Sequence, residues 1–272
     1  MIQSKRSPKR ILRGIIEQIP LLSDLYADRW LFYKQGNAYR GVFQSFEEAI
    51  AAIPSRYKSS YDLSQLHKTP AANLEQIHSS RLNPRDYPVI FWLQSILEQN
   101  SVVVDFGGNT GSSYYSYRKY LDFGEDLRWI VCDVPAAVAS GSQFAQQIGD
   151  RQISFTSDLS SIELPDIFLT CGTLQYVEPS LAELLNSSLA SKPKHLIINR
   201  VPFYDGKEFI TLQNIWQSIV PYKIQNRNEF IREISQLDYE LIDSWSNTRT
   251  CSIPFHPECF VNGYHGFYFK RK

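Results

Sequence analysis

The chain has 272 residues, of which 43% are hydrophobic and 21% charged, which is the composition of a folded globular protein with a sizeable core. Basic and acidic residues number 28 each, so the formal net charge is zero, which argues against broad phosphate-driven binding of nucleic acid. The four cysteines include no CxxC pair, which argues against a metal site. No apolar run approaches the roughly 18 residues of a membrane span and no segment resembles a signal peptide, so we expect a cytoplasmic protein.

Residues 1–84 are expected to form an irregular, mostly helical N-terminal segment that could act as a lid. The basic N-terminus, residues 5–19, alternates lysine and arginine with isoleucine and leucine in a pattern typical of a short amphipathic helix. That helix could pack on its own domain, or it could make weak contact with an anionic membrane surface or a partner. Ser45, with Glu48 three residues on, predicts a capped helix that ends before Pro54.

Residues 85–272 are predicted to form one α/β domain with a mostly parallel sheet. After a helix over Val89–Leu97, short apolar strands alternate with helices at Ala136–Ile148 and Ser180–Ala190. A further helix near Glu229–Leu237 precedes two final strands with no helical crossover between them, so we expect that pair to be antiparallel. The predicted strands are Ser101–Phe106, Arg128–Val134, Gln152–Thr156, Asp166–Cys171, His195–Val201, Tyr239–Trp245 and Tyr264–Lys270.

A glycine-rich turn follows the first predicted strand, where the sequence reads Asp105-Phe106-Gly107-Gly108-Asn109-Thr110-Gly111. Glycines at such a turn let a ligand approach the main chain, because a Cβ atom would block it. Such a turn alone is a weak signal, since it also serves plain chain reversal. We take Gly107, Gly108, Asn109 and Gly111 as candidate cofactor-binding residues.

Two aspartates at consecutive strand ends make the turn more informative. Asp105 precedes the first glycine, where an anion would repel a pyrophosphate but would suit the ammonium and sulfonium cations of S-adenosylmethionine. Asp133 lies 22 residues after Gly111, at the end of the next strand, which is the expected place for an acid that binds two ribose hydroxyls. Either acid alone could be a helix cap or turn residue, but together they favour a nucleoside cofactor.

Other loops at the same edge of the sheet complete the expected cofactor site, since ligands of open α/β sheets bind beyond the strand carboxyl ends. Val134 follows Asp133, and Asp158 with Leu159 closes the third strand, where an acid could accept from the adenine amino group or could be a turn acid. Cys171 and Gly172 follow the fourth strand and should border both cofactor and acceptor.

With these residues in place, the chain resembles class I methyltransferases, and more closely a group of methyltransferases associated with bacterial surface-polysaccharide gene sets. The resemblance implies a Rossmann-like fold with S-adenosylmethionine contacts at Asp105, Gly107, Asn109, Gly111 and Asp133. Asn109 departs from the glycine common there, but asparagine tolerates positive φ. Further blocks carry the resemblance to the group: 41–49, 112–114, 133–135, 199–203, 211–213, 253–257 and 266–269.

Candidate catalytic residues are less clearly marked. The triplet Asp133-Val134-Pro135 is similar to that of small-molecule O-methyltransferases, whose histidine base follows the fourth strand, but residues 174–176 contain no histidine. We expect His265, at the start of the last strand, to be the base for a hydroxyl acceptor, with His256 as second choice. Glu258 could orient either one, Arg200 could hold an anionic or sugar-bearing acceptor, and Tyr176 could line the pocket; each could instead be structural.

The leading hypothesis is therefore an S-adenosylmethionine-dependent methyltransferase acting on a hydroxyl of a small molecule or glycan. A non-catalytic binding module on the same fold is one alternative, which the missing histidine after strand four keeps open. A nicotinamide-dependent oxidoreductase is another, and Asp105 disfavours it.

Overall fold

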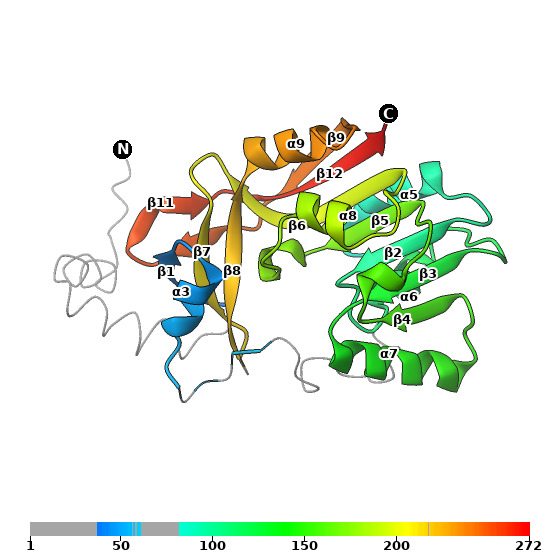
Figure 1. Ribbon diagram of the computed structural model, residues 1–272, viewed down its shortest axis with the longest axis horizontal. Helices are drawn as coiled ribbons and strands as arrows, with labels where there is room; N and C mark the ends of the chain where they lie inside the picture. The colour runs from blue at the N-terminus through cyan, green and yellow to red at the C-terminus, as the bar shows by residue number, and fades with distance from the viewer. Residues whose placement is uncertain (1–36, 56, 58, 61–81, 217) are drawn as a thin grey trace, which may run out of the picture. The chain divides into compact units, whose positions relative to one another are not determined.

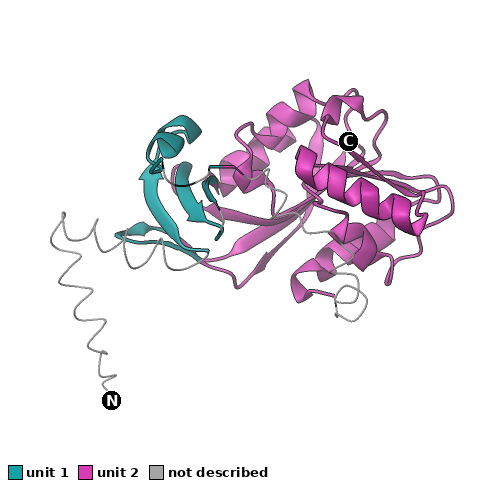
Figure 2. Cartoon of the chain, turned by 90° about the horizontal axis from the view of Figure 1, so that it is seen from below, with its two compact units in different colours: residues 1–59, 209–222, 251–260 teal, residues 60–208, 223–250, 261–272 magenta. Residues whose placement is uncertain are grey.

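The computed structural model describes residues 37–55, 57, 59, 60, 82–216 and 218–272, which fall in two compact units. Unit 1 comprises residues 1–59, 209–222 and 251–260, and unit 2 comprises residues 60–208, 223–250 and 261–272 (Figure 2). This division differs from the sequence-based division at residue 84, which kept the two later segments of unit 1 within a single domain. The basic N-terminus, residues 5–19, lies outside the described residues.

Unit 2 carries all of the described helices except α3, and most of the strands (Figure 1). Its helices are η2 (Pro84–Asp86), α5 (Tyr87–Ile96), α6 (Ser112–Tyr117), α7 (Pro135–Ile148), η3 (Leu159–Ser161), η4 (Leu174–Tyr176), α8 (Leu181–Ser187) and α9 (Arg227–Ser235). Its strands are β2 (Val102–Phe106), β3 (Arg128–Cys132), β4 (Ile153–Thr156), β5 (Ile167–Cys171), β6 (His195–Tyr204), β9 (Tyr239–Asn247) and β12 (Tyr264–Arg271).

The sheet of unit 2 runs in the order β4-β3-β2-β5-β6-β12-β9. The pairs from β4 to β6 are parallel, whereas β12 is antiparallel to both β6 and β9. The final residues of β6 also pair with the end of β8 (Ile219–Asn226), where Phe203 lies opposite Gln225. The prediction of a mostly parallel sheet with a reversed last strand is confirmed.

Successive side chains of the central strands point to opposite faces of this sheet and pack into two hydrophobic cores, one on each face. Val103, Leu169 and Ile197 belong to the core that α5, α6 and α7 cover. Val104 and Ile198, at neighbouring positions, belong to the core that α8 and α9 cover. Each such aliphatic side chain contributes about 1.5–3 kcal/mol when fully buried, so burial on both faces explains why these strands are almost entirely apolar.

Unit 1 contains β1 (Tyr39–Phe43), α3 (Phe46–Ala51), β7 (Phe209–Asn214), the first half of β8, β10 (Cys251–Ile253) and most of β11 (His256–Val261). β1 pairs antiparallel with β7, and β10 pairs with β11. The Ser45 hydroxyl accepts from the Glu48 amide at 3.1 Å, as its capping pattern predicts. The expectation of a mostly helical segment before residue 84 missed β1. β7 was also missed, and its six side chains are all buried, so its sequence shows no alternation.

None of the described helices combines the length and the apolar character needed to cross a bilayer.

Candidate functional site

The turn after β2 has the backbone geometry that its glycines allow. Gly107 has a φ of 74°, and a Cβ atom there would lie 2.0 Å from the Thr173 hydroxyl oxygen. Gly108 packs directly over Asp105, because a Cβ atom there would lie 2.5 Å from the carboxyl carbon. Asn109 has a φ of 55°, so the asparagine does occupy the left-handed conformation that the sequence required of it.

Asp133 fixes this turn from the end of the neighbouring strand. Its Oδ2 accepts a hydrogen bond from the Asn109 amide and its Oδ1 accepts one from the Val134 amide, each at 2.7 Å. Charge-assisted bonds to backbone N–H groups are stronger than neutral ones. The carboxylate therefore holds the turn after β2 and the start of α7 in register while it also lines the adjacent cavity.

Asp105 lies beneath the turn and is fully buried. The Trp129 indole N–H donates to its Oδ2 at 3.2 Å, while Oδ1 has no hydrogen-bond partner. Burial, with the nearby charge of Asp133, raises the pKa of Asp105 to about 7. The sequence placed Asp105 in contact with the cofactor; the structure places it behind Gly108, so any effect on a ligand acts through the electric field and the shape of the turn.

A cavity of about 300 Å³ opens between this turn and the loops after β3 and β5. Nine of the predicted site residues line it: Gly107, Gly108, Asn109, Asp133, Val134, Cys171, Gly172, Tyr176 and Arg200. Ser112, Ser113, Thr173 and Val177 complete the lining. We refer to it as the cofactor cavity, after the ligand that the sequence predicts.

Three other predicted cofactor residues do not line this cavity. Gly111 is the left-handed N-cap of α6, where a Cβ atom would meet Ile153 at 2.7 Å. Asp158 caps η3 by accepting from the Ser160 amide at 2.9 Å and from the Ser160 hydroxyl. These two hydrogen bonds, the one from the hydroxyl foremost, lower the pKa of Asp158. Leu159 is buried in the core under α8 and α9. The turn-acid interpretation of Asp158 therefore describes its observed contacts.

Neither of the two predicted histidine bases lines the cavity. His265 packs beside the rings of Phe203 and Phe267, and burial together with Arg227 lowers its pKa. His256 belongs to unit 1, where its Nδ1 lies 3.1 Å from Oε1 of the exposed Glu258. His265 pairs with Val201 near the carboxyl end of β6, but the sequence could not tell which face of β12 its side chain occupies.

A second, larger cavity of about 740 Å³ shares Ser112, Ser113 and Arg200 with the cofactor cavity. Its remaining lining residues are Leu82, Asn83, Pro84, Asp86, Tyr87, Ser116, Tyr117, Lys119 and Tyr120. None of these nine residues carries a pattern that predicted a functional role from the sequence. Asn83 is the N-cap of η2, and this short helix brings Asp86 into the cavity. We refer to it as the acceptor cavity.

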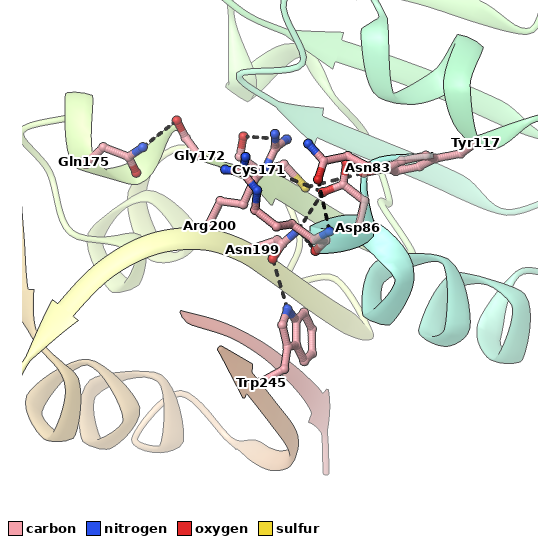
Figure 3. A network of polar contacts seen from close by, with 10 residues as sticks. Asn83, Asp86, Tyr117, Cys171, Gly172, Gln175, Asn199, Arg200 and Trp245 are labelled. Atoms are coloured by element: carbon pink, nitrogen blue, oxygen red, sulfur yellow. Dashed lines mark hydrogen bonds and ion pairs between the residues drawn. The ribbon is translucent and has the colours of Figure 1, made fainter. Parts of the chain in front are cut away.

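Asp86 is the centre of a polar network between the cavities (Figure 3). The Asn199 amide donates to Asp86 Oδ1 at 3.0 Å, and Arg200 Nε lies 3.6 Å from the same oxygen. The Trp245 indole N–H donates to Asn199 Oδ1 at 3.0 Å. Burial raises the pKa of Asp86, and Arg200, Arg85 and hydrogen bonds from Asn199 and Tyr117 oppose that rise.

A β-bulge in β6 produces this arrangement. Asn199 and Arg200 together face one residue of β12, Gly266, because Ile198 pairs with Phe267 and Val201 with His265. Arg200 takes a φ of 60°, which a residue with a side chain adopts only where the surroundings impose it.

Gly266 makes room for the indole that fixes Asn199. A Cβ atom at Gly266 would lie 2.3 Å from the ring of Trp245 on the paired strand β9. The glycine is therefore required by the close approach of the ring, and the ring in turn orients the bulged residues towards the cavities.

Two further polar groups between the cavities are neutral at ordinary pH. Burial raises the pKa of the Cys171 thiol to about 12 and raises that of the Tyr117 hydroxyl well above its usual value. The two groups lie 3.9 Å apart. Neither is therefore a thiolate nucleophile or a ready base, and among the described residues lining the acceptor cavity only Asp86 carries a carboxylate.

Comparison with known proteins gives likeness in structure only. No protein-family model matches the sequence, and no curated protein is similar to it. One similar structure is 1,6-didemethyltoxoflavin-N1-methyltransferase from Burkholderia thailandensis, at 17% identity and a TM-score of 0.47, with 74% of this chain and 86% of that chain covered.

Two other solved structures show the same degree of likeness. Magnesium protoporphyrin IX methyltransferase from Synechocystis PCC 6803 is 13% identical, with 76% of this chain and 94% of that chain covered and a TM-score of 0.47. The [4+2]-cyclase SpnF is 12% identical, with 80% and 99% covered and a TM-score of 0.48. Similarity at this level does not assign a reaction.

The fold follows from the strand order itself. The parallel strands β4-β3-β2-β5-β6, with the antiparallel β12 inserted between β6 and β9, form a Rossmann-like α/β sheet. The fold class expected from the sequence is confirmed.

Proposed function

We propose that the chain is an S-adenosylmethionine-dependent methyltransferase that acts on a hydroxyl group of a small molecule or glycan. The observation that carries the proposal is the cofactor cavity at the strand ends, with Asp133 holding the glycine turn on one side and a larger polar cavity adjoining it on the other. An enzyme that transfers a group from one bound molecule to another needs two adjoining cavities, one for each molecule.

The residues of the cofactor cavity fit a phosphate-free nucleoside. A Cβ atom at Gly107 would collide with Thr173 and one at Gly108 with Asp105, so only glycine lets the turn pack this closely beside the cavity. Asp133 lines the cavity, and Asp105 lies behind the turn with one oxygen that has no partner. A buried carboxyl with an open acceptor position stabilises positive charge nearby and disfavours a pyrophosphate.

The bound cofactor would supply an electrophilic methyl group, and the chain's residues would orient the acceptor and take its proton. Arg200, Ser112 and Ser113 line both cavities, so they are placed where an acceptor hydroxyl would have to lie. We assign proton removal to Asp86, because it is the carboxylate of the acceptor cavity and desolvation makes it more basic than an exposed aspartate. This assignment replaces His265 and His256.

The acceptor cavity supports a polar, hydroxylated acceptor. Three serines, Asn83 and Asp86 provide hydrogen-bonding groups, and the half-exposed rings of Tyr87 and Tyr120 provide faces on which a sugar or aromatic ring can stack. The proposal of a glycan or small-molecule hydroxyl rests on this lining and on the sequence resemblance.

Titration calorimetry with S-adenosylhomocysteine tests the cofactor. We expect micromolar binding by the full chain and no binding of NAD. The Asp133→Asn variant loses one backbone hydrogen bond to a charged oxygen and is expected to bind roughly 10- to 100-fold more weakly. Asp122→Asn, which changes an exposed acid away from the cavity, is the matched control and is expected to bind normally. Lack of S-adenosylhomocysteine binding by the unmodified chain would refute the proposal.

The acceptor is tested separately, by following S-adenosylhomocysteine release from S-adenosylmethionine with nucleotide-linked sugars, lipid-linked sugars and phenols. Turnover with a hydroxyl acceptor that falls sharply in Asp86→Asn, while cofactor affinity is kept, supports both the reaction and the base. Binding of cofactor without turnover of any of these compounds favours the non-catalytic alternative.

A further inference from the structure

Arg200 poses an electrostatic problem for the proposed cofactor. It is the single lysine or arginine among the described residues that line the cofactor cavity. S-adenosylmethionine carries two positive charges, on its sulfonium and its ammonium, and a partly buried cation beside them would weaken binding. The cofactor has one anionic group, the carboxylate of its amino-acid end, and a guanidinium suits a carboxylate better than any other side chain does.

The positions of Arg200 and Asp133 in the sheet match the two ends of such a ligand. Asp133 follows β3 and Arg200 lies in β6, and β2 and β5 separate these strands. Neighbouring strands lie about 4.8 Å apart, so three spacings put the two residues' backbones roughly 14 Å apart across the cavity. With the ribose at Asp133, an extended nucleoside amino acid would direct its carboxylate towards β6.

The structure also fixes where the Arg200 side chain lies (Figure 3). Its Nη2 donates to the Cys171 carbonyl at 3.3 Å, and its Nε lies 3.6 Å from Asp86. Asp86 is itself held by Asn199, which the Trp245 indole orients. A guanidinium restrained on two sides loses little further conformational entropy when a ligand carboxylate binds it.

We infer that Arg200 binds the carboxylate of the cofactor's amino-acid end, and that the Asp86–Asn199–Trp245 chain positions it for this role. The inference rests on the proposed function, since it concerns the same cavity. It differs from the sequence-based interpretation, which gave Arg200 to the acceptor.

The experiment compares two nucleosides that differ only in this group: S-adenosylhomocysteine and its decarboxylated analogue, both measured by calorimetry on the full chain. We expect the unmodified chain to prefer S-adenosylhomocysteine by roughly 10- to 100-fold, the range for hydrogen bonds to a charged group. Arg200→Gln should reduce that preference to threefold or less and leave the affinity for the decarboxylated analogue unchanged or improved. Arg200→Lys, which keeps the charge without the planar fork, should restore part of the preference.

Lys119→Gln is the matched control, because Lys119 is a cation that lines the acceptor cavity and not the cofactor cavity. It should keep the full preference for the carboxylate. The affinity for the decarboxylated analogue reports whether each variant retains an intact site.

Two results would overturn the inference while leaving the proposed function standing. One is an unmodified chain that binds both nucleosides equally well, and this result needs no variant to fold. The other is an Arg200→Gln variant that binds both nucleosides more weakly by the same factor. That result would show that Arg200 maintains the shape of the cofactor cavity and does not bind the carboxylate. If the unmodified chain binds neither nucleoside, the proposed function fails and the inference fails with it.

Discussion

The cofactor cavity and the acceptor cavity are built in opposite ways. The first is lined mainly by residues that directly follow β2, β3 and β5, and the Asn109 amide in its glycine turn donates a hydrogen bond to Asp133 at the end of the next strand. The second is made of side chains from distant segments, since Asp86 meets Asn199 across 113 positions and Trp245 meets Asn199 across 46. Strand ends and glycine turns can be recognised from consecutive residues, so the first cavity could be predicted from the sequence. The second depends on contacts between distant residues and could not be predicted.

Asp105 provides the test with the largest expected effect, because it is the buried acid on which the cofactor cavity is built. Its pKa of about 7 in the folded chain lies above the ordinary value of 3.8. The folded state therefore holds its proton more tightly, and stability falls as pH rises from about 4 to about 7. Each pKa unit corresponds to ~1.4 kcal/mol, so the loss can reach ~4 kcal/mol.

Asp105→Asn should lack this pH dependence. Its free energy of unfolding, measured with denaturant from pH 4 to pH 8, should rise relative to that of the unmodified chain as pH increases. Asp122→Asn, at an exposed site, should follow the unmodified chain throughout. Parallel curves for Asp105→Asn and the unmodified chain would show that the carboxyl is not desolvated as described.

Gly107 tests the backbone side of the comparison. Gly107→Ala places a Cβ atom against Thr173 and forces a non-glycine residue to a φ of 74°, a strain of ~1–3 kcal/mol before the clash is counted. We expect the turn to shift and the affinity for S-adenosylhomocysteine to fall by at least ~100-fold, measured by calorimetry. Gly149→Ala shares the positive φ but meets nothing within 4 Å, so it should cost stability without changing affinity.

The sequence predicted the fold because a strand that is buried on both faces has a nearly continuous run of apolar residues. Residues 102–104, for example, are all valine, and Asp105 and Asp133 lie at strand ends. It missed β7, whose buried positions include Thr211 and Gln213 and so give no hydrophobic run. The bulge at Asn199 and Arg200 was also hidden, since it depends on Gly266 and Trp245, which lie far along the chain and become neighbours only through the pairing of β12 with β6 and β9.

Trp245 tests the side-chain network of the acceptor cavity. Trp245→Phe keeps the ring over Gly266 but removes the indole N–H, which leaves Asn199 Oδ1 buried without that donor. An unsatisfied buried acceptor costs ~1–3 kcal/mol, which denaturant unfolding should detect. Trp92→Phe removes a comparable bond, from the indole to the half-buried Asp243 at 2.8 Å, and should cost less because water can replace the donor. Equal losses in the two variants would contradict a special role for the network.

His265 gives the smallest expected effect, and it separates what a sequence position indicates from what a side chain touches. The residue lies at the sheet edge that the sequence favoured for a base, but its ring packs beside Phe203 and Phe267, and its lowered pKa keeps it neutral at pH 7. His265→Gln should therefore change S-adenosylhomocysteine affinity less than twofold, and turnover with any acceptor found should fall far less than in Asp86→Asn. If His265→Gln lost as much turnover as Asp86→Asn, His265 on β12 would be the base. A neutral imidazole that reaches the reacting hydroxyl is a better proton acceptor near neutral pH than an aspartate is.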